Sequence, residues 1–390
     1  MRTDTIKGAD LVRVIACSAV FMHHLAFSVR KPDLPGAVSV FLDWSDKGKF
    51  GVSVFFVLSG FLLGLPFWKK SDAGRDFEMR YYAIMRIARI APATWLCLII
   101  SLAVDIFYFE RFDSYTAYRF LSGLAFVSDW HWLTFFPLDA NGPLWSLSFE
   151  VSSYIFMPVA FVAIRAIAPA VLHGWRGRYA WSLVILSALT LHGVAFELLP
   201  KAEMANASSF GVRATAVSWF PTYNPFGFFA MFAIGTLAAG VQTAMPNNAR
   251  YPAICHALFV VGAGTLAPVI AFKLIALLYA VPEPPFAFPA LPIAVAMFLV
   301  VVQHVNLGWL IDNKPVATFA RLSFGVYIWH QLVLIFVTAA VDTLLVASLE
   351  RVALIAIISF LITCALASVS YRYFEEPLLE RARVRSRAPG

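Results

Sequence analysis

Apolar runs long enough to cross a bilayer recur along almost the whole chain. A transmembrane helix needs about 20 mostly apolar residues, so a chain of 390 residues has room for roughly ten such helices. Only 14% of the residues are charged against 60% apolar, a balance that a water-soluble domain could not cover with polar surface. The sequence therefore predicts an all-α polytopic membrane protein with about ten transmembrane helices. The expected spans are 10–29, 50–67, 90–108, 144–167, 180–199, 224–242, 252–272, 286–304, 317–341 and 348–371.

Basic residues indicate which loops lie on the cytoplasmic side. Lys and Arg concentrate in alternate loops together with both ends of the chain, which places both termini in the cytoplasm by the positive-inside rule. The first outer loop, with Arg30 and Lys31, runs against this bias. These helix-end residues account for the net charge of +7, so we expect no nucleic-acid partner. The predicted location is the inner (cytoplasmic) membrane, where the lipid bilayer surrounds a multi-pass protein.

The chain shows no linker or internal repeat, so residues 1–390 are expected to form one transmembrane domain. Its extracytoplasmic loop, residues 109–143, is rich in aromatic side chains, and we expect an interfacial helix at 118–127. Trp130 and Trp132 in this loop, with His131 between them, could stack on a sugar. An aromatic belt at the membrane interface accounts for these residues slightly better.

Charged side chains inside an apolar run are costly in hydrocarbon, which makes them candidates for function. In the first run, Arg13 and His24 are eleven residues apart, which puts them on one helix face about 16 Å apart along the axis. Asp10 shares that face and can pair with the Arg13 guanidinium. A neutral imidazole near mid-membrane could take a proton from a hydroxyl, above an arginine that anchors an anion. The equally weighted alternative is that His24 bonds a neighbouring helix and Arg13 snorkels to the inner surface.

Arg86 and Arg89 form an R-x-x-R pair on the approach to the third run. Residues three apart on a helix are neighbours, so the two guanidinium groups could converge on one phosphate-bearing ligand. Taken alone, the pair is better explained by the positive-inside rule.

Two further ionisable residues fall inside predicted helices. Glu150 lies about two turns into the fourth run, where it could orient an imidazole such as that of His24 or pair with an arginine. His330, three residues after Tyr327, could line a cavity or make a plain interhelical hydrogen bond. The four cysteines lie apart in apolar runs and no zinc-ligand, Walker or G-x-S-x-G motif occurs, so we expect no metal site.

Several segments along the chain resemble the acyltransferase-3 family of membrane proteins, which transfer acyl groups to hydroxyls of glycans and small molecules. Asp10-Leu-Val-Arg13, followed by His24, is similar to the family's opening Asp-x-x-Arg and its Arg-x10-His pattern. Arg86-Ile-Ala-Arg89 is similar to its R-x-x-R.

Later segments extend this resemblance through the chain. Trp145-Ser-Leu-Ser-Phe-Glu150 is similar to the family's W-S-L-x-x-E segment. The departures are Ser53, where many members carry Asp, and Val151 and Ser152, where many carry a second Glu and a Gln. Each segment is a weak signal, but six of them in the family's order are specific. The other similar segments are 50–62, 323–330 and 371–377.

The resemblance implies an O-acyltransferase whose donor is acyl-CoA, usually acetyl-CoA, approached from the cytoplasm. It implies a hydroxyl acceptor on a glycan or small molecule. Arg13, His24, Arg86 and Arg89 match functional positions of the family, so the arginine pair is now expected to bind the phosphates of coenzyme A. We hypothesise that His24 takes the acceptor's proton or forms a transient acyl-histidine, that Glu150 holds the imidazole tautomer, and that Arg13 fixes the donor or the surroundings of His24.

The alternative function is a polytopic transporter or flippase of a small anionic or lipid-linked substrate. Transporters often show paired halves with interrupted helices in matching places. Here the intramembrane charges concentrate in the first four runs, and no second half repeats them. The sequence therefore favours the acyltransferase and leaves the acceptor open.

Overall fold

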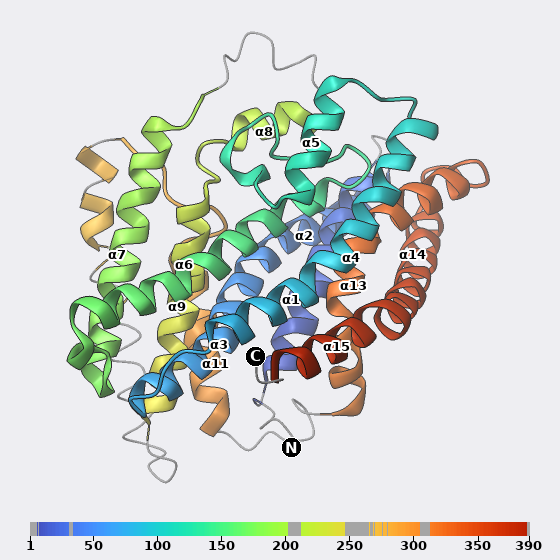
Figure 1. Ribbon diagram of the computed structural model, residues 1–390. Coiled ribbons are helices and arrows are strands. Elements are labelled where there is room, and N and C mark those ends of the chain that lie inside the picture. The colour runs from blue at the N-terminus through green and yellow to red at the C-terminus, as the bar shows by residue number, and fades with distance from the viewer. Residues whose placement is uncertain are drawn as a thin grey trace.

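In the computed structural model the chain is a bundle of α-helices, and the residues that the structure describes contain no β-strand (Figure 1). Those residues are 6, 8–30, 34–201, 212–245, 265, 268, 270–274, 276–278, 280–304 and 313–387. The α-helices are α1 (Ala9–Val29), α2 (Gly36–Asp46), α3 (Gly51–Asp72), α4 (Met79–Phe107), α5 (Ser114–Leu124), α6 (Trp145–Ile167), α7 (Gly174–Leu198), α8 (Val212–Trp219), α9 (Pro225–Ala244), α11 (Ala290–Val301), α13 (Lys314–Asp342), α14 (Leu349–Ser370) and α15 (Glu376–Arg387). Short 3-10 segments are η1 (Lys47–Phe50), η2 (Ser128–Trp130), η3 (Gly142–Leu144), η4 (Pro169–Leu172) and η6 (Val302–His304), and η7 (Tyr371–Glu375) is a π-helix.

The predicted all-α polytopic fold is confirmed. Eight helical segments in the described ranges are long and apolar enough to cross a membrane, and they correspond to eight of the ten predicted spans. The predicted span 252–272 lies mostly outside the described residues, and 286–304 contains the short helix α11. Helices α5 and α8 lie at one end of the bundle, and α15 lies toward the opposite end (Figure 1). The side of the membrane on which each terminus lies stays a prediction.

Helix α9 is enclosed by other helices along nearly its whole length and packs most extensively against α3. Two glycines permit this contact. A Cβ atom at Gly60 would lie 2.0 Å from the carbonyl oxygen of Phe232, and one at Gly235 would lie 1.9 Å from that of Val57. Small residues of this kind let two transmembrane backbones approach closely, and the resulting α3–α9 pair forms the centre of the bundle.

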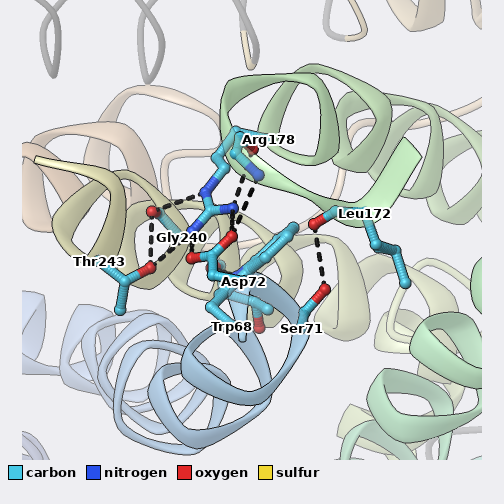
Figure 2. A network of polar contacts seen from close by, with 9 residues as sticks. Trp68, Ser71, Asp72, Leu172, Arg178, Gly240 and Thr243 are labelled. Atoms are coloured by element: carbon cyan, nitrogen blue, oxygen red, sulfur yellow. Dashed lines mark hydrogen bonds and ion pairs between the residues drawn. The ribbon is translucent and has the colours of Figure 1, made fainter. Parts of the chain in front are cut away.

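An ion pair between the buried Arg178 and the partly exposed Asp72 joins α3, α7 and α9 at the end of α3 (Figure 2). The Arg178 guanidinium donates to both carboxylate oxygens of Asp72, at 2.6 and 2.5 Å, and its Nε donates to the carbonyl of Gly240 at 2.8 Å. The same guanidinium donates to Thr243 Oγ1 and lies 4.3 Å from the ring centroid of Trp68. Arg178 precedes the predicted span 180–199, whereas in the structure it is fully buried and binds three helices together.

Residues 109–143 contain one α-helix, α5, which begins four residues before the predicted 118–127. The Asp113 carboxylate caps it by accepting from the backbone N–H of Thr116 at 2.7 Å, which sets the earlier start. Arg119 on α5 is fully buried and donates to the Asp139 carboxylate at 2.6 Å. This ion pair lies within residues 109–143, and the segment is joined to α4 by the Asp105 carboxylate, which accepts from the backbone N–H of Asp139 at 3.0 Å and of Ala140 at 2.8 Å.

Candidate active site

Four of the five predicted site residues line one cavity of about 150 Å³. Arg13 enters it from α1, Arg86 and Arg89 from α4, and Glu150 from α6. We call this space the arginine cavity. Its other polar lining residues are Ser59, Ser146, Tyr154, Ser323 and Tyr327. Helices that are far apart in the sequence thus place three cations and one carboxylate around one space.

The two arginines of the R-x-x-R pair have different surroundings. Nε of Arg86 is buried, and no hydrogen-bond partner for it occurs among the described residues. Arg89 instead lies 3.4 Å from a carboxylate oxygen of Glu375 in η7, and Glu375 is only 2% exposed. Buried polar atoms are nearly always hydrogen-bonded, so the unsatisfied Arg86 donor indicates room for an anionic or polar ligand.

Arg13 pairs with Asp10 at 3.1 Å, as its spacing predicts. Its helix face runs along α13, because the Cys17 thiol, one turn further on, contacts the Ser323 carbonyl at 3.5 Å. Further along, toward the C-terminal end of α1, His24 contacts His330 of α13. Arg13 therefore lines the arginine cavity, whereas His24, eleven residues further along α1, lies outside its lining.

Glu150 is held by hydroxyl groups. The Ser59 hydroxyl donates to its Oε1 at 3.1 Å, and the Tyr154 hydroxyl, one turn along α6, donates to the same oxygen. Tyr154 is itself fixed because its backbone carbonyl accepts from the hydroxyl of Tyr82 at 3.0 Å. No contact between Glu150 and His24 occurs in the described part of the chain. The predicted contact of Glu150 with the His24 imidazole is therefore not seen. Glu150 contacts the Ser59 and Tyr154 hydroxyls instead.

His24 does not line the arginine cavity. Its Nδ1 lies 2.9 Å from the Val20 carbonyl oxygen and 3.1 Å from Nε2 of His330, whose own Nδ1 lies 2.6 Å from the Tyr327 carbonyl. Carbonyl oxygens only accept, so both Nδ1 atoms carry hydrogen when the rings are neutral. This tautomer leaves the Nε2 lone pair of His24 free to accept a proton, and no described residue hydrogen-bonds to it.

Tyr327 connects the cavity to the imidazole pair. Its side chain lines the arginine cavity, and its hydroxyl donates to the Pro143 carbonyl at 2.7 Å and lies 2.5 Å from the Ser146 hydroxyl. Its ring centroid is 5.9 Å from that of His330, which in turn contacts His24. Of the two interpretations of His330, the structure shows the interhelical hydrogen bond.

A buried carboxyl group, that of Asp129 in the 109–143 segment, lies beside α6. Asp129 is fully buried, and its Oδ2 accepts from the Ser152 hydroxyl at 2.6 Å. Burial raises the pKa of Asp129 to about 7, against the lowering effect of the Ser152 hydrogen bond. Next to it, Trp130 packs edge-on against Phe226 with ring centroids 5.8 Å apart, and remains partly exposed.

Ser59, Tyr154 and Glu375 also contact the site, although the sequence predicted no role for them. Ser59 and Glu375 lie in segments that resemble the family, and Tyr154 follows such a segment. Tyr154 carried a usable signal, since it lies four residues after Glu150 and must share its helix face. Ser59 and Glu375 reach the site through tertiary contacts that no local spacing encodes.

The fold and this site define a multi-pass helical membrane protein with a cationic cavity among its helices. The family model described as an acyltransferase domain matches residues 6–372, so the chain belongs to the acyltransferase-3 family. The resemblance seen in the sequence is confirmed.

Among curated relatives, the chain is 26% identical over 396 residues to "Putative peptidoglycan O-acetyltransferase YrhL" of Bacillus subtilis. That match covers 96% of this chain and 55% of the relative, so the chain spans about half of that protein's length. The chain is also 25% identical over 168 residues to the peptidoglycan O-acetyltransferase OatA of Listeria monocytogenes. That match covers 41% of this chain and 24% of the relative. No solved structure matches the chain.

Proposed function

We propose that the chain is a membrane O-acyltransferase that moves an acetyl group from acetyl-CoA to a hydroxyl of a cell-envelope glycan. The observation that carries this proposal is the arginine cavity, where Arg13, Arg86 and Arg89 surround a space large enough for part of a small molecule. Guanidinium groups suit phosphate oxygens, and coenzyme A carries several phosphate charges. Family membership favours this function over the transporter, and the names of the relatives make peptidoglycan the first acceptor to test.

The unsatisfied Arg86 donor supports the fit of an anionic donor substrate to the cavity. Arg13 and Arg89 are partly neutralised by Asp10 and Glu375, which leaves Arg86 as the group that gains most from a phosphate or carbonyl oxygen. The hydroxyls on Glu150 keep its carboxylate oriented within the same cavity.

In the proposed reaction, Nε2 of His24 takes the proton of the acceptor hydroxyl. The acceptor oxygen then attacks the thioester carbonyl, a C–O bond forms, and the C–S bond breaks. The proton passes from His24 to the departing thiolate, so the products are the ester and coenzyme A. His330 would stabilise the His24 tautomer through its acceptor nitrogen. Tyr327 lies between the arginine cavity and the imidazole pair. To reach His24 from the arginine cavity, the thioester would have to pass the Tyr327 side chain.

The direct test is transfer by the purified chain in proteoliposomes. Acetyl-CoA labelled in the acetyl group is supplied on one side and peptidoglycan fragments on the other, and mass spectrometry reads the products. We expect acceptor mass to increase by one acetyl group only when both substrates are present. Cell-envelope glycans of strains with and without the gene should differ by the same mass. Unchanged glycans together with no transfer in proteoliposomes would reject the proposal.

A further inference from the structure

A second and larger cavity adjoins the arginine cavity. Its volume is about 820 Å³, within the range of roughly 300–1,000 Å³ that small-molecule sites occupy. The end of α3, the start of α4 and Arg383 of α15 line it. Leu63 and Arg86 border both cavities, so the two spaces lie next to each other at the Arg86 side chain. We call this larger space the Lys70 cavity.

The charges around the Lys70 cavity favour an anion. Lys70, Arg86 and Arg383 contribute three cations against the single carboxylate of Glu78. Lys70 and Glu78 form an ion pair with each other. Planar guanidinium groups bind phosphate oxygens through paired N–H donors.

One wall of the Lys70 cavity is aromatic. The rings of Phe77 and Tyr82 both pack on Phe67, with centroids 5.1 and 5.3 Å away. Tyr81 lies beside them on α4 and also lines the cavity. Aromatic side chains of this kind offer faces on which a nucleobase stacks, and stacking tolerates any base because every base has a π face.

The position of α15 depends on η7, the segment before it, which contacts the arginine cavity through Glu375. The π-helical segment η7 turns the chain so that α15 packs against α4. Within it, the Glu375 carboxylate accepts from Ser370 at 3.2 Å and contacts Arg89 of the arginine cavity at 3.4 Å. Single π-helical turns are frequent at functional sites. Here the turn brings Arg383 to the Lys70 cavity.

We propose that the Lys70 cavity binds the phosphorylated adenosine end of coenzyme A, with Arg383 as a specificity residue. The thioester end then occupies the arginine cavity, and Arg86 contacts the donor where the two cavities meet. This inference rests on the proposed function and adds the residues that recognise the nucleotide. An anionic lipid headgroup presents the same phosphate chemistry, so the test separates the two sources.

The test compares Arg383→Ala with Arg385→Ala, a control on the same exposed helix whose side chain does not line the cavity. The KM is measured for acetyl-CoA and for acetyl-pantetheine, a thioester donor without the nucleotide. Arg383→Ala should raise the KM for acetyl-CoA about tenfold, the low end for a charged hydrogen bond at a partly exposed position. The same variant should leave the KM for acetyl-pantetheine unchanged, and Arg385→Ala should change neither.

Direct binding of adenosine 3′,5′-bisphosphate gives a readout that does not depend on catalysis. Arg383→Ala should weaken its binding by a similar factor in nanodiscs with or without phosphatidylglycerol. Equal effects of Arg383→Ala on both donors, or a defect that follows the phosphatidylglycerol content, would overturn the nucleotide assignment. So would an Arg383→Ala variant that behaves like Arg385→Ala while the parent protein uses acetyl-CoA. A parent protein that neither binds nor uses acetyl-CoA would instead reject the proposed function.

Discussion

Replacing Arg86 by Gln should weaken the binding of coenzyme A without destabilising the fold. Its Nε is buried without a partner in the described structure, so the substitution removes a donor that the protein itself leaves unused. A hydrogen bond to a charged group contributes about 1.5–3 kcal/mol, which corresponds to roughly a ten- to hundredfold loss of affinity. Arg86→Lys keeps the charge but loses the planar fork, so it should recover only part of the affinity.

Replacing Arg89 by Gln should have a second effect, because Arg89 contacts the buried carboxylate of Glu375. Leaving a buried acceptor without its charged partner costs about 1–3 kcal/mol of stability, and the partial exposure of Arg89 favours the lower half of that range. Arg89→Gln should therefore lower both the affinity for coenzyme A and the Tm. Adding Glu375→Gln should restore the Tm but not the affinity.

The assay for both variants is calorimetric binding of coenzyme A to detergent-purified protein, with the Tm read by intrinsic fluorescence on the same samples. The reasoning is refuted if Arg86→Gln binds coenzyme A as tightly as the parent. It is also refuted if Arg86→Gln loses stability to the same extent as Arg89→Gln, since the two arginines then share one structural role.

Two further outcomes follow from groups outside the proposed chemistry. Arg178→Ala should destabilise the fold by about 1–3 kcal/mol, because it removes the hydrogen bonds of a buried guanidinium to the partly exposed Asp72, to Gly240 and to Thr243, whereas Arg176→Ala on the exposed face should not. Comparison of the two Tm values checks this, and equal values would contradict it. Burial raises the pKa of Asp129 to about 7, above about 3.9 in an unfolded chain, so its protonated form is the one favoured in the fold. The contribution of protonated Asp129 to stability should be complete below about pH 4 and lost as the pH rises through about 7. Asp129→Asn should remove this dependence of the Tm on pH. A parent Tm that is independent of pH in that window would contradict the raised pKa of Asp129.

The sequence was sufficient for those parts of the site that depend on helical spacing. Arg86 and Arg89 face one space because three residues make nearly one turn, and Asp10 reaches Arg13 for the same reason. Long apolar runs predicted the spanning helices because, in hydrocarbon, a helix satisfies all of its backbone hydrogen bonds internally. The contact between Glu150 and Tyr154 was within reach of the same argument.

The remaining contacts depend on how helices pack, which spacing does not encode. His24 and His330 are 306 residues apart, and only the pairing of α1 with α13 brings their rings together. Arg178 lies just before a predicted span, where the positive-inside rule already accounts for an arginine. Its burial between α3, α7 and α9 could therefore not be predicted from the sequence. Helix α5 begins early because of a local cap that hydropathy does not register.

If His24 is the base for transfer, His24→Ala and His23→Ala should differ sharply in the proteoliposome assay. The two imidazoles are neighbours, but His23 contacts Asp46 whereas His24 contacts His330 beside the arginine cavity. A general base contributes about 10²–10⁴-fold, so His24→Ala should lose acetyl transfer by that factor while coenzyme A binding and membrane insertion persist. His23→Ala should retain most of the activity. Transfer at the parent rate by correctly inserted His24→Ala protein would contradict the account.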